Sequence, residues 1–497
     1  MSRAFRLYDT MTRQVKELLP AESGHLRFYS CGPTVYNYAH IGNFRTFLTG
    51  DLITRTAQAL GWHVSCVSNI TDVGHLTSED QDDGEDRMEK GLRSKEGEQF
   101  VTVWVLAAFY AEAFKNDWVR LNLQRPMVWP KATEHMREQI LGIEALIAAG
   151  KAYETPTGVY FSVSSFEDYG KLSGNKNREE LLTGVRNVVQ DDNKRNPADF
   201  ALWKKDDKHL MQWYSPWGWG FPGWHIECSV MAMQYLGETL DLHAGGEDLI
   251  FPHHECEIAQ SESLTGKPFA NHWIHTRFLQ VDGQKMSKSL GNFFTARDLV
   301  DGQGANPLAL RYALISQNYG TPHNFTMELL ADATKKVERY KLCMDTVATL
   351  ADRTETGDDG VFGNQLDELY ESVLDAMCDN LNTSVALGRA LEGTRVILRQ
   401  DHAMSPEMAR SAKNFLRRIN GLLGIVCHEE IGECVSRRTS APSVDEVLIL
   451  SKIEDRNAAK LAKDFSSADQ IRVDLDRLGI ELRDTPEGTT WKIKSKI

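Results

Sequence analysis

The sequence contains no long uninterrupted apolar segment. No run of about 18 apolar residues occurs in its 497 residues, so we expect no membrane-spanning helix. The first residues, MSRAFRLYDTMTRQ, also lack the apolar core of a secretory signal peptide. With 41% hydrophobic and 25% charged residues, the composition is that of an ordinary globular chain. We therefore expect a cytoplasmic location.

Cysteine is scarce and scattered, which excludes a disulfide framework. In a reducing compartment each cysteine is expected to be a free thiol, a metal ligand or a nucleophile. For any one of them the alternative is a small buried apolar residue. The eight cysteines are Cys31, Cys66, Cys228, Cys256, Cys343, Cys378, Cys427 and Cys434.

The chain has no excess of basic residues. Its 70 acidic and 56 basic side chains give a formal net charge of −14, which argues against a generic nucleic-acid coat protein. RNA binding through a local basic patch stays open, because affinity follows the charge at the contact. Part of the acidic excess lies in TSEDQDDGED (77–86), which predicts a solvated loop.

The N-terminal part carries the pattern of a parallel sheet. HLRFYSC (25–31) alternates as a strand does, and HVSCVSNI (63–70) predicts a second strand. Between them, residues 43–62 form an amphipathic helical pattern that ends at Gly61. Strand, helix and strand at this spacing predict a βαβ unit.

Further along, the sheet is interrupted and then resumes. The pattern over 98–149 predicts helix, and YETPTGVYFSV predicts a hairpin over 153–163. Strands are predicted over 240–251 and 272–281. The sheet therefore continues after a long insertion.

The C-terminal part has a different character. Long amphipathic helices begin after residue 325 and continue to about residue 424. A polar linker is predicted over 433–443, followed by a compact tail of two helices and a hairpin with the turn TPEG. A chain of this length is expected to hold roughly three to five structural units.

Two glycine-containing segments have a composition that suits phosphate binding. In CGPTVYNYAHIGN (31–43) a turn leads into a helix whose N-terminal N–H groups suit an anion; Gly42 permits close approach and His40 can donate. In QKMSKSLGN (284–292) two lysines three residues apart can hold a polyphosphate. Taken singly, the alternatives are an ordinary turn capped by an asparagine and a solvated basic loop.

Metal-capable side chains gather in FPHHECE (251–257), and Cys31 and Cys228 add thiols from elsewhere. Pro252 suits the first turn of a helix. On that helix Glu257 shares a face with both histidines, and Cys256 shares a face with His253. Mixed sulfur, imidazole and carboxylate ligands favour zinc. Helical spacing thus narrows the ligand set without choosing it.

In this order, the segments resemble the signatures of class I aminoacyl-tRNA synthetases. The first glycine-containing segment is similar to the HIGH region of that class, and KMSKS (285–289) matches its second signature. Within the class, five segments resemble the cysteinyl-tRNA synthetase family: CGPTVY, GWHIECS, NITDVGH (69–75), DFALWK (199–204) and HAGGEDLIFPHHE (243–255). The tail is similar to the anticodon-binding module of that family.

The resemblance implies ATP-dependent ligation of L-cysteine to cysteine tRNA through cysteinyl-adenylate, by a monomer with one zinc ion and Mg²⁺-ATP as substrate. It implies an α/β Rossmann-like catalytic domain with a parallel sheet and an insertion, then an α-helical bundle and a small C-terminal α+β module. The implied parts are the first catalytic half (1–117), the insertion (118–205), the second catalytic half (206–280), the KMSKS loop and stem-contact region (281–325), the tRNA-binding helical bundle (326–432), the linker (433–443) and the anticodon-binding module (444–497).

The resemblance also implies the site residues. Its zinc ligands are Cys31, Cys228, His253 and Glu257. Its cysteine pocket uses Cys31, Thr71, Trp224 and His243. Its catalytic residues are His40, Asn43, Lys285 and Lys288, and its ATP-binding residues are these four with Gly32, Gly42, Gly245, Gly246 and Asp248.

A zinc ion suits the selection of cysteine over serine. A shaped pocket separates such a pair by only about 1–3 kcal/mol. A thiol loses its proton when it coordinates zinc, whereas a hydroxyl is a poorer ligand. We expect Glu257 to be the weak ligand that gives way to the substrate. In the tail, Trp491 is expected either to stack on an RNA base or to fill the hairpin core.

The sequence departs from the family pattern in three places. Asn43 stands at the second signature histidine, Cys256 stands where an asparagine is usual, and the segment over 316–325 differs. Two other functions stay open. One is a cysteine ligase of mycothiol-type biosynthesis, a family that lacks the C-terminal module. The other is a non-catalytic synthetase-like RNA-binding paralogue, a kind of protein that usually loses zinc or signature residues.

Overall fold

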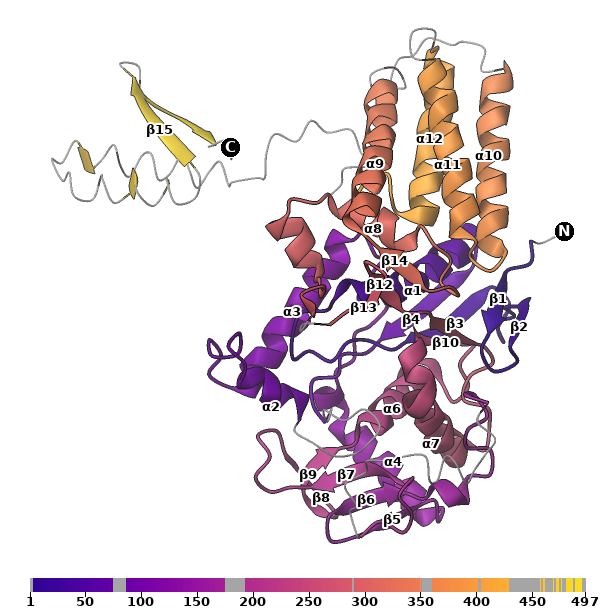
Figure 1. Cartoon of the computed structure of the whole chain (residues 1–497), viewed down its shortest axis with the longest axis vertical. Helices are drawn as coiled ribbons and strands as arrows, with labels where there is room; N and C mark the ends of the chain where they lie inside the picture. The colour runs from indigo at the N-terminus through magenta and orange to yellow at the C-terminus, as the bar shows by residue number, and fades with distance from the viewer. Residues whose placement is uncertain are drawn as a thin grey trace. The chain divides into compact units, whose positions relative to one another are not determined.

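The structure is a computed structural model in which the chain divides into two compact units, Met1–Cys434 and Val435–Ile497. Each unit is described by itself (Figure 1). The residues that the structure describes are 3–74, 86–174, 193–287, 290–348, 350, 360–400, 404–428, 456, 459–460, 468, 471–472, 475, 480–485 and 488–493.

A four-stranded parallel sheet organises the first unit. Its order is β11-β10-β3-β4, with β3 at His25–Ser30, β4 at His63–Ser68, β10 at Leu242–Gly246 and β11 at Trp273–Thr276. Every neighbouring pair is parallel. Helix α1 (Ile41–Ala59) connects β3 to β4, so the predicted βαβ unit is confirmed. The Rossmann-like class and the return of the sheet after an insertion are confirmed too.

Helix α1 is almost wholly buried because its side chains pack both on the sheet and on later helices. Phe44, Phe47 and Leu52 belong to a core that reaches into the C-terminal helices. The helix ends at Ala59, and Gly61 with φ of +84° allows the chain to turn back into β4, as the sequence predicts.

The insertion between β4 and β10 has its own core. It contains α2 (Arg87–Leu92), α3 (Val103–Arg120), the 3₁₀ turns η1 (Ala132–His135) and η2 (Val163–Ser165), and α4 (Met136–Ala148). A five-stranded antiparallel sheet of order β5-β6-β7-β9-β8 follows: β5 Ala152–Glu154, β6 Gly158–Phe161, β7 Phe200–Lys205, β8 Trp213–Ser215 and β9 Gly218–Pro222. The predicted hairpin is confirmed. The helical prediction over 98–149 is wrong for the loop at 121–131, which crosses between α3 and η1.

Two predicted strands near the site are shorter than expected. The strand predicted over 240–251 ends at Gly246, and short helical turns follow at η3 (Glu247–Leu249) and η4 (Ile250–His254). The strand predicted over 272–281 splits into β11 and β12 (Leu279–Val281), which belong to different sheets. At the break, buried Arg45 donates to the carbonyls of Arg277 and Phe278, and the Arg277 N–H donates to the Tyr319 carbonyl at 2.9 Å, so the chain leaves β11 for the sheet that contains β12.

Two further helices and a small sheet follow β9 in the chain. Helix α6 runs over Trp224–Leu236 and α7 over Glu255–Thr265. The small sheet has the order β13-β12-β14, with β13 at Gln284–Lys285 and β14 at His323–Phe325. The N-terminal hairpin, β1 Arg6–Asp9 and β2 Gln14–Glu17, lies on the edge of the parallel sheet beside β11.

A helical bundle completes the first unit, as predicted. After η6 (Asp298–Gly302) and α8 (Pro307–Ile315) come α9 (Met327–Ala348), α10 (Gly360–Cys378), α11 (Thr383–Arg399) and α12 (Pro406–Leu423). Ser405 caps α12 and Pro406 occupies its first turn, which explains the sharp start. None of the described helices is long and apolar enough to cross a bilayer.

Buried charges tie the bundle to the sheet. Arg55 of α1 donates to Asp51 at 2.8 Å, and Arg311 of α8 also binds the Asp51 carboxylate. The two guanidinium groups then donate to carbonyls at the end of α12: Arg55 to Asn420 at 3.2 Å and Arg311 to Leu423 at 2.8 Å. The bundle is thereby fixed to α1, the helix that His40 precedes.

The second unit contains a hairpin, β15 (Ile480–Thr485) and β16 (Gly488–Ile493), in which Trp491 pairs with Leu482. The hairpin is confirmed. The two helices predicted before it, the linker over 433–443 and most of the acidic loop over 77–86 lie outside the described residues. Cys427 is disulfide-bonded, so the expectation that every cysteine is a free thiol, metal ligand or nucleophile is wrong there.

Candidate active site and metal centre

Four side chains from distant elements meet beside the parallel sheet. Cys31 follows β3, Cys228 lies on α6, His253 on η4 and Glu257 on α7. Their ligand atoms all lie within 4.8 Å of one another, and all four residues are buried. The structure therefore brings together the four residues that the resemblance implies as zinc ligands.

Local structure aims His253 and Glu257 at one point. Phe251 is extended, and the helical path begins again at Pro252. One turn separates the two residues, and Nε2 of His253 lies 2.8 Å from Oε1 of Glu257. The shared helix face predicted from FPHHECE is present.

A second group of metal-capable side chains overlaps the first. It consists of Cys31, His243, His254 and Glu257, with ligand atoms again within 4.8 Å. Nε2 of His254 lies 3.4 Å from Sγ of Cys31, and Nε2 of His243 lies 2.6 Å from Oε2 of Glu257. Helical spacing left His254 open as a ligand, but the resemblance implied a set with Cys228 and His253, so this second group was not predicted.

Hydrogen bonding favours the group with two thiols. A neutral histidine that binds a metal through Nε2 carries its proton on Nδ1, and that proton needs an acceptor. Nδ1 of His243 is buried and has no hydrogen-bond partner in the structure. Nδ1 of His253 instead lies 2.8 Å from Nδ1 of His225. A metal on the first group therefore leaves no buried N–H without an acceptor. A metal bound by Nε2 of His243 would leave one, at a cost of roughly 1–3 kcal/mol.

The electrostatics of the metal-free protein suit a cation at this point. The hydrogen bond from Cys31 lowers the pKa of the Cys228 thiol to about 6, and burial raises the pKa of Cys31. Burial acts to lower the pKa of His253, but the charges of Glu257 and Cys228 and the hydrogen bonds to both together outweigh burial and raise the pKa to about 10. Burial acts to raise the pKa of Glu257, but the charges of His243 and His253 and their hydrogen bonds hold that pKa well below its ordinary value. A thiolate and a carboxylate thus share one buried space, and the mixture of sulfur, imidazole and carboxylate fits zinc.

The other polar residues of FPHHECE have different tasks. Glu255 accepts from the backbone N–H groups of Gly170 at 3.1 Å and Ser173 at 2.7 Å, which fastens the insertion. Sγ of Cys256 lies 3.4 Å from the hydroxyl of Tyr169, inside the core of the insertion. Cys256 belongs to neither group of metal-capable residues that the described part of the chain contains.

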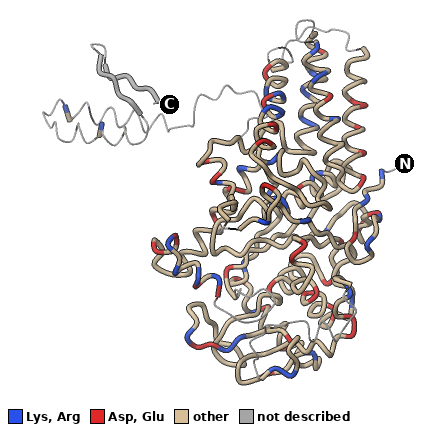
Figure 2. The backbone as a smooth tube through the Cα atoms, viewed as in Figure 1, with Lys and Arg blue, Asp and Glu red and all other residues tan. Residues whose placement is uncertain are grey.

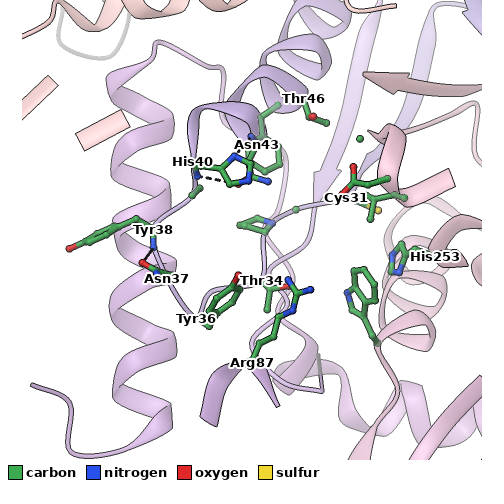
Figure 3. A pocket seen from close by; sticks show the side chains of 18 of the residues that line it. Cys31, Thr34, Tyr36, Asn37, Tyr38, His40, Asn43, Thr46, Arg87 and His253 are labelled. Atoms are coloured by element: carbon green, nitrogen blue, oxygen red, sulfur yellow. Dashed lines mark hydrogen bonds between the residues drawn. The ribbon is translucent and has the colours of Figure 1, made fainter. Parts of the chain in front are cut away.

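A cavity of about 360 Å³ opens from the two-thiol group. Cys31 and His253 line one side of it, and His40 and Asn43 line another, as Figure 3 shows. Trp224 lines the cavity as well, with its ring centroid 4.2 Å from that of His253. One cavity therefore joins the metal-capable residues to the start of α1.

Two of the predicted cysteine-pocket residues do not line this cavity. Thr71 is buried and donates its hydroxyl proton to Glu227 at 3.0 Å. His243 is buried against Glu257 and stacks on Trp273 with centroids 4.6 Å apart. Both side chains are therefore buried in the protein and are not among the residues that line the cavity.

His40 is the cap of α1, which differs from the capping asparagine considered above. Nδ1 of His40 accepts from the Asn43 N–H at 3.0 Å, and Oδ1 of Asn43 accepts from the His40 N–H at 3.1 Å. Burial lowers the pKa of His40 to about 4. Nδ1 is therefore bare, and the neutral ring carries its proton on Nε2, which leaves Nε2–H as a donor at the cavity.

The predicted ATP-binding glycines and Asp248 divide into residues that line the cavity and residues that do not. Gly32, Gly246 and Asp248 line the cavity, whereas Gly42 and Gly245 do not. A Cβ on Gly42 would lie 2.7 Å from the methyl carbon of Met286. The close neighbour of Gly42 in the structure is thus the end of a side chain of the KMSKS segment, and the close approach of a phosphate to Gly42 stays a prediction.

The lysine loop is only partly described. Lys285 is exposed on β13, with Nζ 5.8 Å from the ring centroid of Phe278, and does not line the cavity. Lys288 lies outside the described residues. The loop is fastened at its base, because Asn292 accepts from the Ser287 N–H at 2.8 Å and donates to the Lys285 carbonyl at 3.2 Å.

Sequence reasoning missed several cavity residues. No role was predicted for the aromatic and polar side chains inside the first signature. None was predicted for Arg87 either, which directly follows the acidic segment 77–86 in the sequence. Alternation of bulky and polar residues in PTVYNYA was the available signal for the former. The missed lining residues include Thr34, Tyr36, Asn37, Tyr38, Thr46, Arg87 and Phe293.

Comparison with known proteins agrees with this geometry. Residues 17–335 match the family model described as tRNA synthetases class I (C) catalytic domain. Solved structures share the fold at low identity. Methionyl-tRNA synthetase of Mycobacterium tuberculosis in complex with methionyl-adenylate has a TM-score of 0.57 and 14% identity, with 80% of this chain and 92% of that chain covered. The agnB2 LeuRS–tRNA–LeuAMS complex of Agrobacterium radiobacter K84 has a TM-score of 0.58 and 13% identity, with 87% and 88% covered.

The parallel sheet, the capped helix at the cavity and the family match define a class I aminoacyl-tRNA synthetase. Cysteine–tRNA ligases are similar along their whole length. That of Salinibacter ruber is 51% identical, with 100% of this chain and 99% of the relative covered, and that of Caldicellulosiruptor saccharolyticus is 41% identical, with 97% and 98% covered. The chain belongs to the family of cysteine–tRNA ligases.

Proposed function

We propose that the chain joins L-cysteine to cysteine tRNA at the expense of ATP, through cysteinyl-adenylate. One observation carries the proposal: a single cavity is lined by two of the zinc-capable residues, Cys31 and His253, and by the phosphate-suited start of α1. An amino acid held by its thiol at the first side can present its carboxylate toward a nucleotide at the second.

The carboxylate of cysteine is already a nucleophile, so activation needs no general base. Its oxygen forms a bond to the α-phosphorus of ATP, the bond from that phosphorus to the bridging oxygen breaks, and pyrophosphate leaves. The protein contributes alignment and donors for the phosphate charge. Nε2–H of His40, at the N-terminus of α1, supplies a donor on one side. Asn43 adds its amide NH₂ there, since its Oδ1 is engaged by His40.

Zinc bound at Cys31, Cys228, His253 and Glu257 would supply a soft cation that prefers the substrate thiolate to a hydroxyl. Trp224 closes the cavity against His253 and excludes water from that side. Gly246 and Asp248 provide polar groups for the nucleoside, and Lys285 and Lys288 are proposed to hold the phosphates when the loop moves.

The helical bundle offers a surface for RNA. Its helices segregate charge: α10 carries acidic residues and no lysine or arginine, whereas α11 and α12 are rich in arginine (Figure 2). Arg395, Arg399 and Arg417 are exposed. A local basic surface of this kind binds phosphates even though the chain as a whole carries a charge of −14. The tail adds ten basic and nine acidic residues over 449–497, and we propose that it reads the anticodon.

Two assays in series test the proposal. The first is cysteine-dependent exchange of pyrophosphate into ATP, with serine as the control amino acid. The second is charging of purified cysteine tRNA. A cysteine ligase without a tRNA partner would pass the first and fail the second, and a non-catalytic paralogue would fail both.

A further inference from the structure

The imidazole of His225 lies directly behind the metal-capable group. His225 is on the first turn of α6, three residues before Cys228, and is only 5% exposed. Its Nδ1 lies 2.8 Å from Nδ1 of His253. The ring also packs edge-on against Phe200, with centroids 5.7 Å apart, which limits its rotation.

The position of the proton on the His253 ring determines which of the two histidines donates in this hydrogen bond. Nε2 of His253 faces Glu257 at 2.8 Å, so Nε2 is the nitrogen that points to the metal-capable group. A metal needs the lone pair on that nitrogen, so the proton of the neutral ring must be on Nδ1. Two Nδ1 atoms 2.8 Å apart share one proton, and His253 must therefore donate to a bare Nδ1 of His225.

We propose that His225 is a positioning residue of the metal centre: it accepts the Nδ1 proton of His253 and so holds that ring in the tautomer and orientation that bind zinc. Helix α6 then sets two ligands at once, because Cys228 is on the helix and His253 is fixed through His225. The proposal rests on the proposed zinc site but not on ligase activity.

The second group of metal-capable residues provides a matched control. Nδ1 of His254 lies 2.8 Å from Nε2 of His275, whose own Nδ1 lies 2.7 Å from the hydroxyl of Thr10. His275 thus contacts Nδ1 of His254 in the same way that His225 contacts Nδ1 of His253. Substitution of His225 and of His275 therefore separates a metal held by Cys228 and His253 from a metal held by His243 and His254.

The test measures zinc affinity of the full chain by competition with a chromogenic chelator. Three variants are compared with the unaltered protein: His225→Leu, which removes the acceptor, His225→Asn, which restores an acceptor oxygen, and His275→Leu. We expect His225→Leu to weaken zinc binding by about 10–100-fold, the usual effect of losing such a partner. His225→Asn and His275→Leu should stay within about threefold of the unaltered protein on the same reasoning.

Several results would overturn the proposal. Unchanged affinity in His225→Leu removes the role of His225. Equal loss in the leucine and asparagine variants assigns the effect to packing, and a larger loss in His275→Leu places the metal on the other group. If His225→Leu does not fold, His225→Phe is the acceptor-free variant. Pyrophosphate exchange is measured separately, so a protein without ligase activity would refute the proposed function while leaving the zinc result to be judged by itself.

Discussion

Glu257 and His243 form a fully buried contact in which Oε2 lies 2.6 Å from Nε2. The other oxygen of the carboxylate, Oε1, faces His253 at 2.8 Å. Glu257 thus has one oxygen among the metal-capable atoms and a second that is already held elsewhere. From this division we infer that Glu257 would be the ligand to give way at a bound metal, because the contact with His243 would stabilise the carboxylate after it moves.

Zinc-edge X-ray absorption, with and without cysteine, tests this behaviour of Glu257. We expect the zinc–oxygen distance to lengthen or the oxygen to be lost when the substrate thiolate enters, since five strong ligands crowd a site that prefers four. His243→Phe serves as the comparison, because it removes the group that receives the displaced carboxylate. An oxygen shell that cysteine does not change would count against Glu257 as the weak ligand.

Lys288→Ala should reduce cysteine-dependent pyrophosphate exchange by about 100-fold, the usual scale for one charge that stabilises a developing phosphate anion. The zinc content should stay normal, because Lys288 is not one of the four proposed zinc ligands. Lys267→Ala is the matched surface control, since Lys267 is exposed and pairs with Glu238 rather than with the cavity. Equal exchange rates in Lys288→Ala and the unaltered protein would remove Lys288 from the site.

Cys256→Asn should retain both zinc and activity, whereas Cys228→Ser should lose zinc. The thiol of Cys256 lies 3.4 Å from the Tyr169 hydroxyl, and an asparagine amide can bond to the same group. Cys228 is within the ligand group and its thiolate is stabilised there. Metal analysis of the two purified variants checks the contrast, and zinc loss in Cys256→Asn would mean that the wrong cysteine partner was chosen for His253.

The low pKa of His40 has a consequence for stability. Burial lowers this pKa from an ordinary value of 6.5 to about 4 in the folded chain. Between these values the unfolded chain binds more protons, so the free energy of unfolding rises with pH. The contribution of His40 is complete above pH 6.5 and is lost as the pH falls toward 4; its upper size is about 3 kcal/mol.

His40→Asn should flatten that pH dependence while keeping a cap for the Asn43 N–H. Urea unfolding at several pH values between 4 and 7 measures the difference between the variant and the unaltered protein. Taking the difference removes the contributions of His272 and His323, whose pKa values burial also lowers. Parallel stability curves for the two proteins would contradict the assignment.

The elements of this fold follow from local pattern, but the arrangement of the site depends on distant contacts. The βαβ unit, the hairpin and the bundle helices were predictable because alternation and helical periodicity reflect one buried face. The split between β11 and β12 was not, because the contacts at the break come from Arg45 and Tyr319, which are far away in the sequence. The ligand set came from resemblance, since spacing alone allowed either histidine of FPHHECE. His225 escaped notice because its role appears only when α6 and η4 are placed side by side.

Removal of residues 435–497 should separate the two half-reactions. The boundary follows the division into two compact units, and every residue of the cavity lies in the first unit. We therefore expect pyrophosphate exchange to stay within about twofold and charging of cysteine tRNA to fall by about 10-fold or more, as when one RNA-binding module is lost. Trp491→Ala in the full chain is the finer version, and thermal unfolding of that variant distinguishes loss of a stacking contact from loss of the hairpin. If the truncated chain charged tRNA as well as the full chain does, the tail would have no part in reading the RNA.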